Sequence, residues 1–109
     1  MEPIGRTSGA AVPACPFAEG ISLANDLCTM LILDELFAEN SLPRDVSSRT
    51  GVDFVLVAAR LQELESQGMV RAVAESGTDN KLYGLTKKGL EFHPVIRAVQ
   101  AWQAKWKQD

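Results

Sequence analysis

Cysteine and histidine are scarce in this sequence, which holds two cysteines and one histidine in 109 residues. Cys15 and Cys28 form no CxxC pair, and with His93 they lack the ligand spacing of a zinc site, so we expect no metal and no cofactor. No apolar run approaches the ~20 residues that a membrane span requires, and no basic stretch followed by an apolar core indicates a secretory signal. We therefore expect a cytoplasmic protein without membrane contact, whose thiols are reduced by default.

Positive charge is also in short supply. Eleven Lys and Arg residues stand against fourteen Asp and Glu residues, giving a net charge of −3. The cations concentrate in residues 69–90, where four bases outnumber two acids, whereas residues 1–40 hold one base against six acids. This balance is well short of a strongly basic nucleic-acid footprint. The sequence also offers no nucleophile with a matching base and no phosphate-cradling loop, so we expect no enzymatic activity.

The composition that is present, 46% hydrophobic and 23% charged, suits one folded domain with a modest core. A chain this short buries a limited fraction of its surface, and pairing with a second copy would help its stability. Residues 1–14 combine prolines and glycines with no hydrophobic period, which predicts a flexible arm. We expect residues 15–109 to form the domain.

The hydrophobic periods predict a fixed series of elements. A helix opens at Pro16, a second covers about 29–39, and a short one covers 43–49 and ends at Gly51. Asp53 is a suitable N-cap for a long helix over 54–67, which Gly68 ends. Strands over 69–73 and 81–85 flank a turn at 76–80, and a final helix starts near Leu90. The series predicts an α+β, mostly α fold: a winged helix-turn-helix with a two-stranded β-hairpin wing and a C-terminal dimerisation helix.

Several short segments make the sequence similar to one known family. They are Cys15-Pro16, Thr29-Met30-Leu31-Ile32-Leu33-Asp34-Glu35-Leu36, Arg60-Leu61-Gln62-Glu63-Leu64-Glu65-Ser66-Gln67-Gly68-Met69-Val70, Tyr83-Gly84-Leu85-Thr86-Lys87-Lys88-Gly89, and Pro94 followed by Trp102. In this order they resemble the HxlR-type branch of the MarR-like winged-helix transcription regulators, over about residues 15–106. The resemblance implies a dimeric regulator that binds double-stranded DNA. In several members of the family an N-terminal cysteine, here Cys15, senses electrophiles or oxidants.

The sequence departs from the family in three places. Leu27-Cys28 stand where a basic residue and a tryptophan are usual. The recognition helix opens with the apolar run Val52-Asp53-Phe54-Val55-Leu56-Val57-Ala58-Ala59 where the family has polar or basic residues. The wing tip, Glu75-Ser76-Gly77-Thr78-Asp79-Asn80, lacks the usual prolines and arginine. These departures bear on whether DNA binding is retained.

The candidate DNA-binding residues are Arg44, Arg49, Asp53, Phe54, Val55, Ala58 and Lys81. Before Arg60 the outer face of the long helix offers no Arg, Lys, Asn, Gln, Ser or Thr for base edges. Phe54 and Val55 could pack inward in a slightly rotated helix, contact a protein or small molecule, or contact thymine methyls. The cations could reach phosphates or form ordinary solvated surface charge. For Arg60 we favour pairing with nearby acids.

Two further candidate sites lie toward the ends of the domain. The apolar residues of the last helix recur at helical spacing, and we expect a dimer seam in preference to core packing alone. The candidate interface residues are Phe17, Ile21, Val95, Val99, Trp102 and Trp106. Cys15 sits at a helix start, where the helix dipole favours the thiolate, so it is a redox-sensing candidate. The alternative is an unreactive thiol.

These observations support two hypotheses. The first is a dimeric DNA-binding regulator of the HxlR type that responds to a redox or electrophile signal or to a small ligand. The second is a repurposed winged-helix dimer, which binds a protein or an apolar small molecule through the hydrophobic face of its recognition helix.

Overall fold

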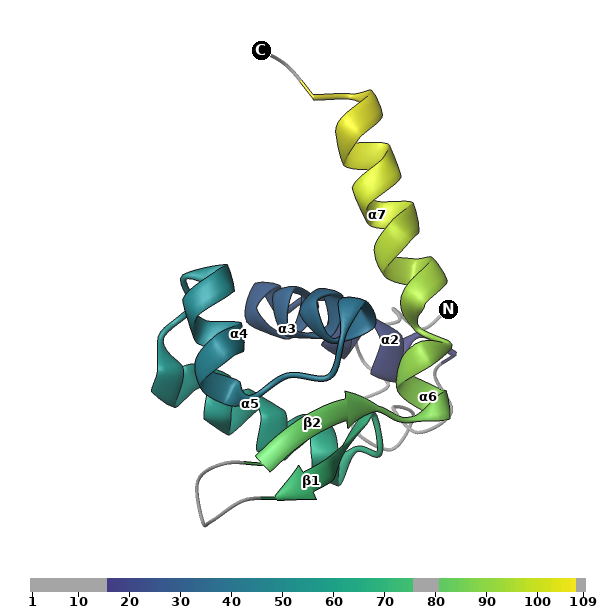
Figure 1. The fold of residues 1–109 in the computed structure, drawn as a ribbon. Helices are drawn as coiled ribbons and strands as arrows, with labels where there is room; N and C mark the ends of the chain where they lie inside the picture. The colour runs from purple at the N-terminus through teal and green to yellow at the C-terminus, as the bar shows by residue number, and fades with distance from the viewer. Residues whose placement is uncertain (1–15, 76–80, 108–109) are drawn as a thin grey trace.

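The computed structural model describes residues 16–75 and 81–107. The predicted arm over 1–14, Cys15 and the predicted turn over 76–80 lie outside the described residues. The elements follow the chain in the order α2 (Ala18–Ala24), α3 (Leu27–Ala38), α4 (Pro43–Thr50), α5 (Phe54–Ser66), β1 (Val70–Glu75), β2 (Lys81–Leu85), α6 (Lys87–Leu90) and α7 (His93–Lys105) (Figure 1). The predicted winged helix-turn-helix, with α4 and α5 as its helical pair and β1–β2 as its wing, is confirmed.

The boundaries of the helical pair follow local backbone chemistry. Gly51 ends α4 with a left-handed φ of 79°, and Gly68 follows α5 with a φ of 78°. An L side chain is strained in this conformation, so glycine is suited to both turns. The Asp53 carboxylate caps α5 by accepting the backbone N–H of Val55 at 3.1 Å. These three signals were predicted from the sequence and are confirmed.

The core lies where α3, α5 and the hairpin meet. Val57, Leu61 and Leu64, expected on the inner face of the long helix, are all buried. Within the described ranges the hydrophobic core cluster consists of Leu23, Ile32, Leu33, Leu36, Val46, Val57, Leu61, Leu64, Met69, Val70, Tyr83 and Ile96. Removing this apolar surface from water is the main term that holds the helical pair and the wing together.

The wing is tied to the helical pair by backbone hydrogen bonds. β1 and β2 pair antiparallel, with Val70 opposite Leu85 and an irregularity between Ala72 and Ala74. Ser41, just before α4, also pairs with Tyr83: its N–H donates to the Tyr83 carbonyl at 3.0 Å and its carbonyl accepts from the Tyr83 N–H at 2.9 Å. The segment entering α4 therefore extends the wing sheet by one bridge.

The sequence predicted one final helix that starts near Leu90. That start is wrong, because two separate helices, α6 and α7, stand here. The Thr86 hydroxyl accepts the Gly89 N–H at 3.1 Å and so caps α6, and α7 begins anew at His93 with Pro94 in its first turn. A Cβ on Gly89 would overlap the carbonyl oxygen of Met69. This close approach of α6 to the start of β1 is a tertiary contact that no helical period reveals.

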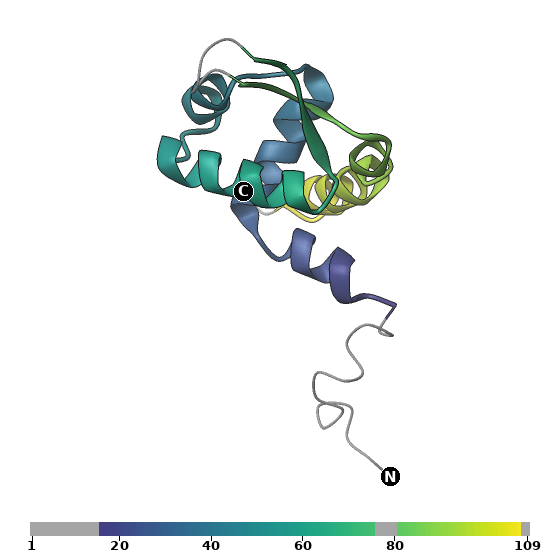
Figure 2. The same cartoon turned by 90° about the horizontal axis from the view of Figure 1, so that it is seen from below.

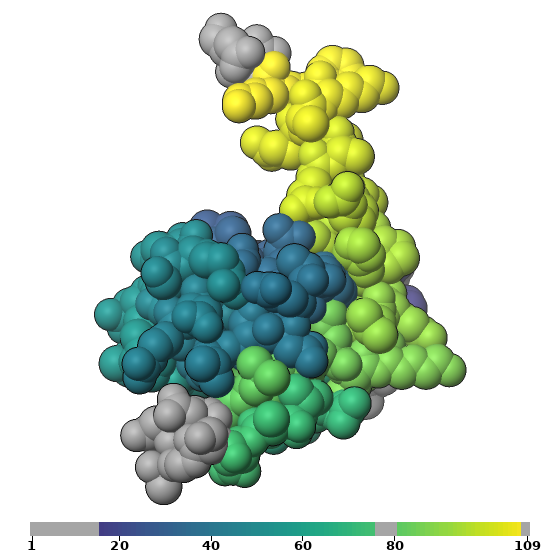
Figure 3. All heavy atoms as spheres, in the orientation of Figure 1, coloured from purple at the N-terminus to yellow at the C-terminus, as the bar shows by residue number. Residues whose placement is uncertain are grey.

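The two end helices lie apart from the compact body. Figure 1 and Figure 3 show α7 leaving the body as an arm, and every residue from Arg97 to Lys107 is exposed. In Figure 2, α2 lies outside the body formed by the helical pair and the hairpin. Lys88 of α6 forms an ion pair with Glu19 of α2 at 2.7 Å, which links α6 to α2. Among the described residues, α2 and α7 are thus exposed along much of their length.

Candidate nucleic-acid interface

A surface groove of about 400 Å³ lies between α4, α5 and β2. Four of the predicted DNA-binding residues line it: Arg44 from α4, Phe54 and Ala58 from α5, and Lys81 from β2. Pro43, Gln62 and Tyr83 complete the lining. The structure therefore brings side chains of α4, of the recognition helix α5 and of the wing together in one groove.

Two positively charged side chains line this groove. Arg44 projects from the first turn of α4 and Lys81 stands at the start of β2. Neither cation has an ion-pair partner among the residues that the structure describes. The groove beside the recognition helix thus contains two cations, Arg44 and Lys81.

The exposed face of α5 is apolar over its first two turns. Val55 is 72% exposed and Phe54 is 43% exposed, and Ala59 is also on the surface. The interpretation in which Phe54 and Val55 pack inward is therefore wrong. Both side chains are exposed because Val57 and Leu61 occupy the inner face of the helix.

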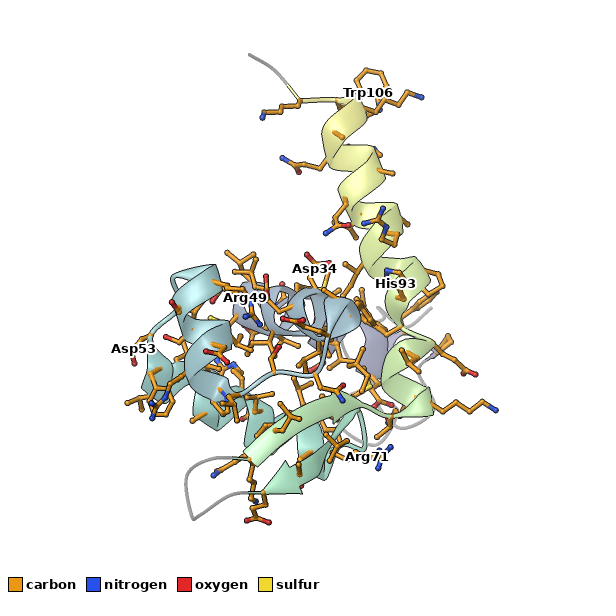
Figure 4. The ribbon with its side chains drawn as sticks, viewed as in Figure 1. Asp34, Arg49, Asp53, Arg71, His93 and Trp106 are labelled. Atoms are coloured by element: carbon orange, nitrogen blue, oxygen red, sulfur yellow. The ribbon has the colours of Figure 1, made fainter. Side chains whose placement is uncertain are left out.

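Arg49 lies elsewhere. Figure 4 shows it between α4 and α3, where its Nε donates to Glu35 at 2.7 Å and one terminal nitrogen donates to the Ser41 hydroxyl at 2.7 Å. Glu39 lies 3.8 Å from the other terminal nitrogen. The guanidinium thus links α3, α4 and the segment that pairs with the wing, at the protein surface. Asp53, by contrast, lies at the outer edge of the turn into α5 (Figure 4).

Arg60 has the structural role that we favoured for it. Its Nε donates to the Asp26 carboxylate at 2.6 Å, and a terminal nitrogen lies 3.4 Å from Glu63. Asp26 also caps α3 by accepting the Cys28 N–H at 3.0 Å. Burial raises the pKa of Asp26, but the hydrogen bond and the charge of Arg60 outweigh this effect and the pKa is lowered. The pair ties the middle of the recognition helix to the junction of α2 and α3.

The predicted interface residues on α2 and α7 are exposed. Trp102 and Trp106 are 64% and 58% exposed, and Trp106 lies at the far end of the arm (Figure 4). Phe17, Ile21, Val95 and Val99 are also exposed, whereas Ile96 is buried against the core. Core packing alone therefore does not account for the apolar stripe of α7. Two large aromatic side chains on a projecting helix are typical of a surface that another chain covers.

Sequence reasoning missed several residues beside these surfaces. Gln62 lines the groove, and its position four residues after Ala58 was a signal that helical spacing could have used. A second, more apolar groove of about 370 Å³ lies between α3 and α7, and Leu27, Met30, Leu31 and Val99 are among its lining residues. It joins the exposed face of α7 to the end of α2. Such a groove depends on how α7 leaves the body, which the sequence pattern does not specify.

Within the two described ranges, no cluster of three or more His, Cys, Asp and Glu residues could hold a metal ion. No helix in this part of the chain combines the length and apolarity needed to cross a membrane.

Comparison with known proteins bears directly on this arrangement. The model of the family described as HxlR-like helix-turn-helix matches residues 25–109. The chain belongs to this family. The matched region contains the whole helical pair, the wing and α7, so the family resemblance seen in the short sequence segments is confirmed.

Individual relatives agree with the assignment. MJ0925 of Methanocaldococcus jannaschii, an uncharacterized HTH-type transcriptional regulator, is 40% identical over 58 residues, which are 53% of this chain and 49% of the relative. The match therefore spans about half the length of that protein. The crystal structure of PA1607 superposes with a TM-score of 0.80 at 28% identity, covering 94% of this chain and 72% of that one. The reduced form of the transcriptional regulator YodB from B. subtilis gives 0.70 at 27% identity, covering 86% and 95%.

Proposed function

We propose that this HxlR-family chain is a transcription regulator that binds double-stranded DNA as a homodimer, in the cytoplasm and without enzymatic activity. The observation that carries the proposal is the groove that Arg44 and Lys81 line together with Phe54 at the exposed start of α5. A recognition helix enters the major groove while neighbouring elements contact the backbone. Here α4 supplies one cation and the wing supplies the other, so two neighbouring elements would each bring a positive side chain to the phosphates beside α5.

The dimer is supported by the exposed apolar faces of α2 and α7. In water, Trp102 and Trp106 would cost free energy that a second copy could recover by covering them. A two-fold dimer would present two copies of α5 about one helical turn of DNA apart, which predicts a palindromic site. Replacing Trp102 by Ala should raise the concentration at which sedimentation shows dimers, while far-ultraviolet circular dichroism stays unchanged.

A signal input is part of the proposal. YodB, to which this chain is similar, is known in reduced, quinone-bound and diamide-treated forms. Cys15 of this chain opens the domain in sequence, and we propose that oxidation or an electrophile at its thiol, or a small ligand, alters DNA binding. Diamide treatment should change operator affinity in the native protein and leave Cys15→Ser unaffected. Equal responses of both proteins would place the signal elsewhere.

The first experiment is selection from fragmented genomic DNA of the source organism by the purified, reduced protein, repeated after oxidation. Enrichment of a palindromic site supports the proposal, and failure of a folded dimer to enrich any fragment in either state contradicts it. Binding to the recovered site should weaken steeply with salt, because each neutralised phosphate adds about −0.9 to the slope of log K against log salt concentration. Arg44→Ala and Lys81→Ala should each reduce the slope by roughly one per contact. Arg97→Ala, which removes a cation from α7, is the matched control and should leave the slope unchanged.

A second candidate function rests on the apolar character of α5. The 72% exposure of Val55 would also suit a protein or an apolar small molecule as the partner. Salt separates the two candidates, because binding without phosphate contacts should barely respond between about 50 and 200 mM. Phe54→Arg should strengthen general DNA affinity if α5 faces DNA, and should abolish binding of an apolar partner.

A further inference from the structure

We propose that this chain reads the 5-methyl groups of thymine with the first two turns of α5, so that its preferred half-site carries A·T pairs under this segment. The proposal rests on the proposed DNA-binding function and deepens it. It names what the recognition helix selects in the major groove, and it assigns Val55 as a specificity-determining residue together with Ala59 and Phe54.

The outward line of α5 presents methyl groups and one phenyl ring. Val55 and Ala59 are one turn apart and both exposed, and Phe54 stands at the edge of the groove. In the major groove the thymine methyl is the one apolar group by which a base pair is distinguished. The first two turns of α5, whose fully exposed side chains are apolar, can therefore discriminate among bases through contacts with that methyl.

The polar residues near this segment are already engaged. The Asp53 carboxylate accepts the Val55 N–H as the helix cap, and Arg60 is held by Asp26 and Glu63. The first exposed side chain of α5 that could form hydrogen bonds with a base edge is Gln62, which follows Ala58 by one turn in the groove lining. Glutamine pairs through two hydrogen bonds with adenine. Gln62 thus also favours an A·T pair, through its adenine rather than its thymine.

Charge at the rim favours DNA over an apolar partner for this face. Arg44 and Lys81 come from two different elements and line the same groove as Phe54, Ala58 and Gln62 of α5. An apolar ligand gains little from neighbouring cations, whereas a duplex presents phosphates along the edge of its major groove. The cations of this groove and the apolar side chains of α5 are thus complementary to DNA whose major groove carries thymine methyl groups.

The test replaces thymine by deoxyuridine, which pairs identically and lacks only the methyl group. Each thymine of the operator recovered by genomic selection is replaced in turn, and affinity is measured by fluorescence anisotropy at fixed salt. Burying one methyl contributes enough that its loss should weaken binding about fourfold at each contacted position. Replacements outside the segment under α5 should have no effect.

A variant separates contact from DNA shape. Val55→Ala removes two methyl groups from the helix, so the deoxyuridine replacement at the position that Val55 touches should no longer weaken binding by this variant. An effect that acts through duplex stiffness would persist in the variant, because it does not involve the side chain. Leu90→Ala removes an exposed apolar side chain from α6 and should keep the full response of the native protein.

The outcomes are distinct. A folded dimer that binds no duplex overturns the proposed function and this inference with it. A dimer that binds its operator but tolerates every deoxyuridine replacement within twofold overturns only the inference. Equal deoxyuridine responses in the native protein and Val55→Ala also overturn the role of Val55.

Discussion

Replacing Gly89 by Ala tests the packing that sets the base of the α7 arm. Helix propensity alone favours Ala over Gly by about 1 kcal/mol inside a helix. Contact geometry acts in the opposite direction, because a Cβ at Gly89 would overlap the carbonyl oxygen of Met69. That oxygen accepts the Thr86 N–H at 3.0 Å, and the Thr86 hydroxyl, whose proton is shared with the Gly68 carbonyl, lies 3.1 Å from it. It cannot move aside without loss of these bonds.

We therefore expect Gly89→Ala to destabilise the protein by about 1–3 kcal/mol, the usual cost of forcing atoms into a packed site. For a domain of this size each 1 kcal/mol corresponds to roughly 4–8 °C in Tm. Urea and thermal unfolding, followed by circular dichroism at one fixed protein concentration, measure the change. The concentration is fixed because association would otherwise shift the apparent stability.

Gly20→Ala is the matched control. Gly20 lies within α2, and a Cβ there would meet no atom within 4 Å. The same chemical change should therefore stabilise the protein by about 0.5–1 kcal/mol, since only helix propensity acts. The two variants should move the free energy of unfolding in opposite directions. A Gly89→Ala protein as stable as the native one, or more stable, would refute the reasoning about α6.

Other substitutions test the core and the two arginine braces. Leu61→Ala, which empties a fully buried site on α5, should cost 2–5 kcal/mol in urea unfolding; a loss below about 1 kcal/mol would contradict its place in the core. Asp26→Asn keeps a capping oxygen but removes the charge that Arg60 holds. Because the pKa of Asp26 is lowered in the folded state, its contribution is complete above its ordinary range near pH 4 and is lost as the pH falls through the lowered value. The Tm difference between native protein and variant should thus shrink in acid, and a difference that grows there would reverse the sign. Arg49→Ala should lower Tm and leave the salt slope of operator binding unchanged, since its guanidinium braces α3 and α4; a slope reduced by about one per contact would instead assign it to a phosphate.

Local chemistry explains which features could be predicted from the sequence. Gly51, Asp53 and Gly68 act on the backbone within a few residues, and the sequence alone located the ends of α4 and α5 from them. The spacing of Val57, Leu61 and Leu64 likewise predicted the inner face of α5. Each of these signals is contained in a single element, so no knowledge of the neighbouring elements was needed.

The remaining features depend on contacts between distant segments. The close approach of Gly89 in α6 to the Met69 carbonyl joins residues twenty positions apart, so no helical pattern reveals it. The position of Arg49 depends on which acids of α3 face α4, and the exposure of Phe54 depends on the rotation of α5 against the core. The sequence predicted that Arg44, Phe54, Ala58 and Lys81 belong to one site. It could not predict that Arg49 turns away from it.

The bridge between Ser41 and Tyr83 has a consequence for how this family can diversify. It is made of main-chain atoms, so the distance between the wing and the helix pair does not depend on which side chains occupy the groove. Under the proposed reading of DNA by α5, exchange of Val55, Ala59 or Gln62 changes the base contacts, while the main-chain bridge preserves the spacing of wing and helices. A residue inserted between Ala38 and Pro43 would alter that spacing and displace Arg44 relative to Lys81. Point substitutions on α5 are therefore the route by which this fold can change specificity without disturbing the connection through Ser41.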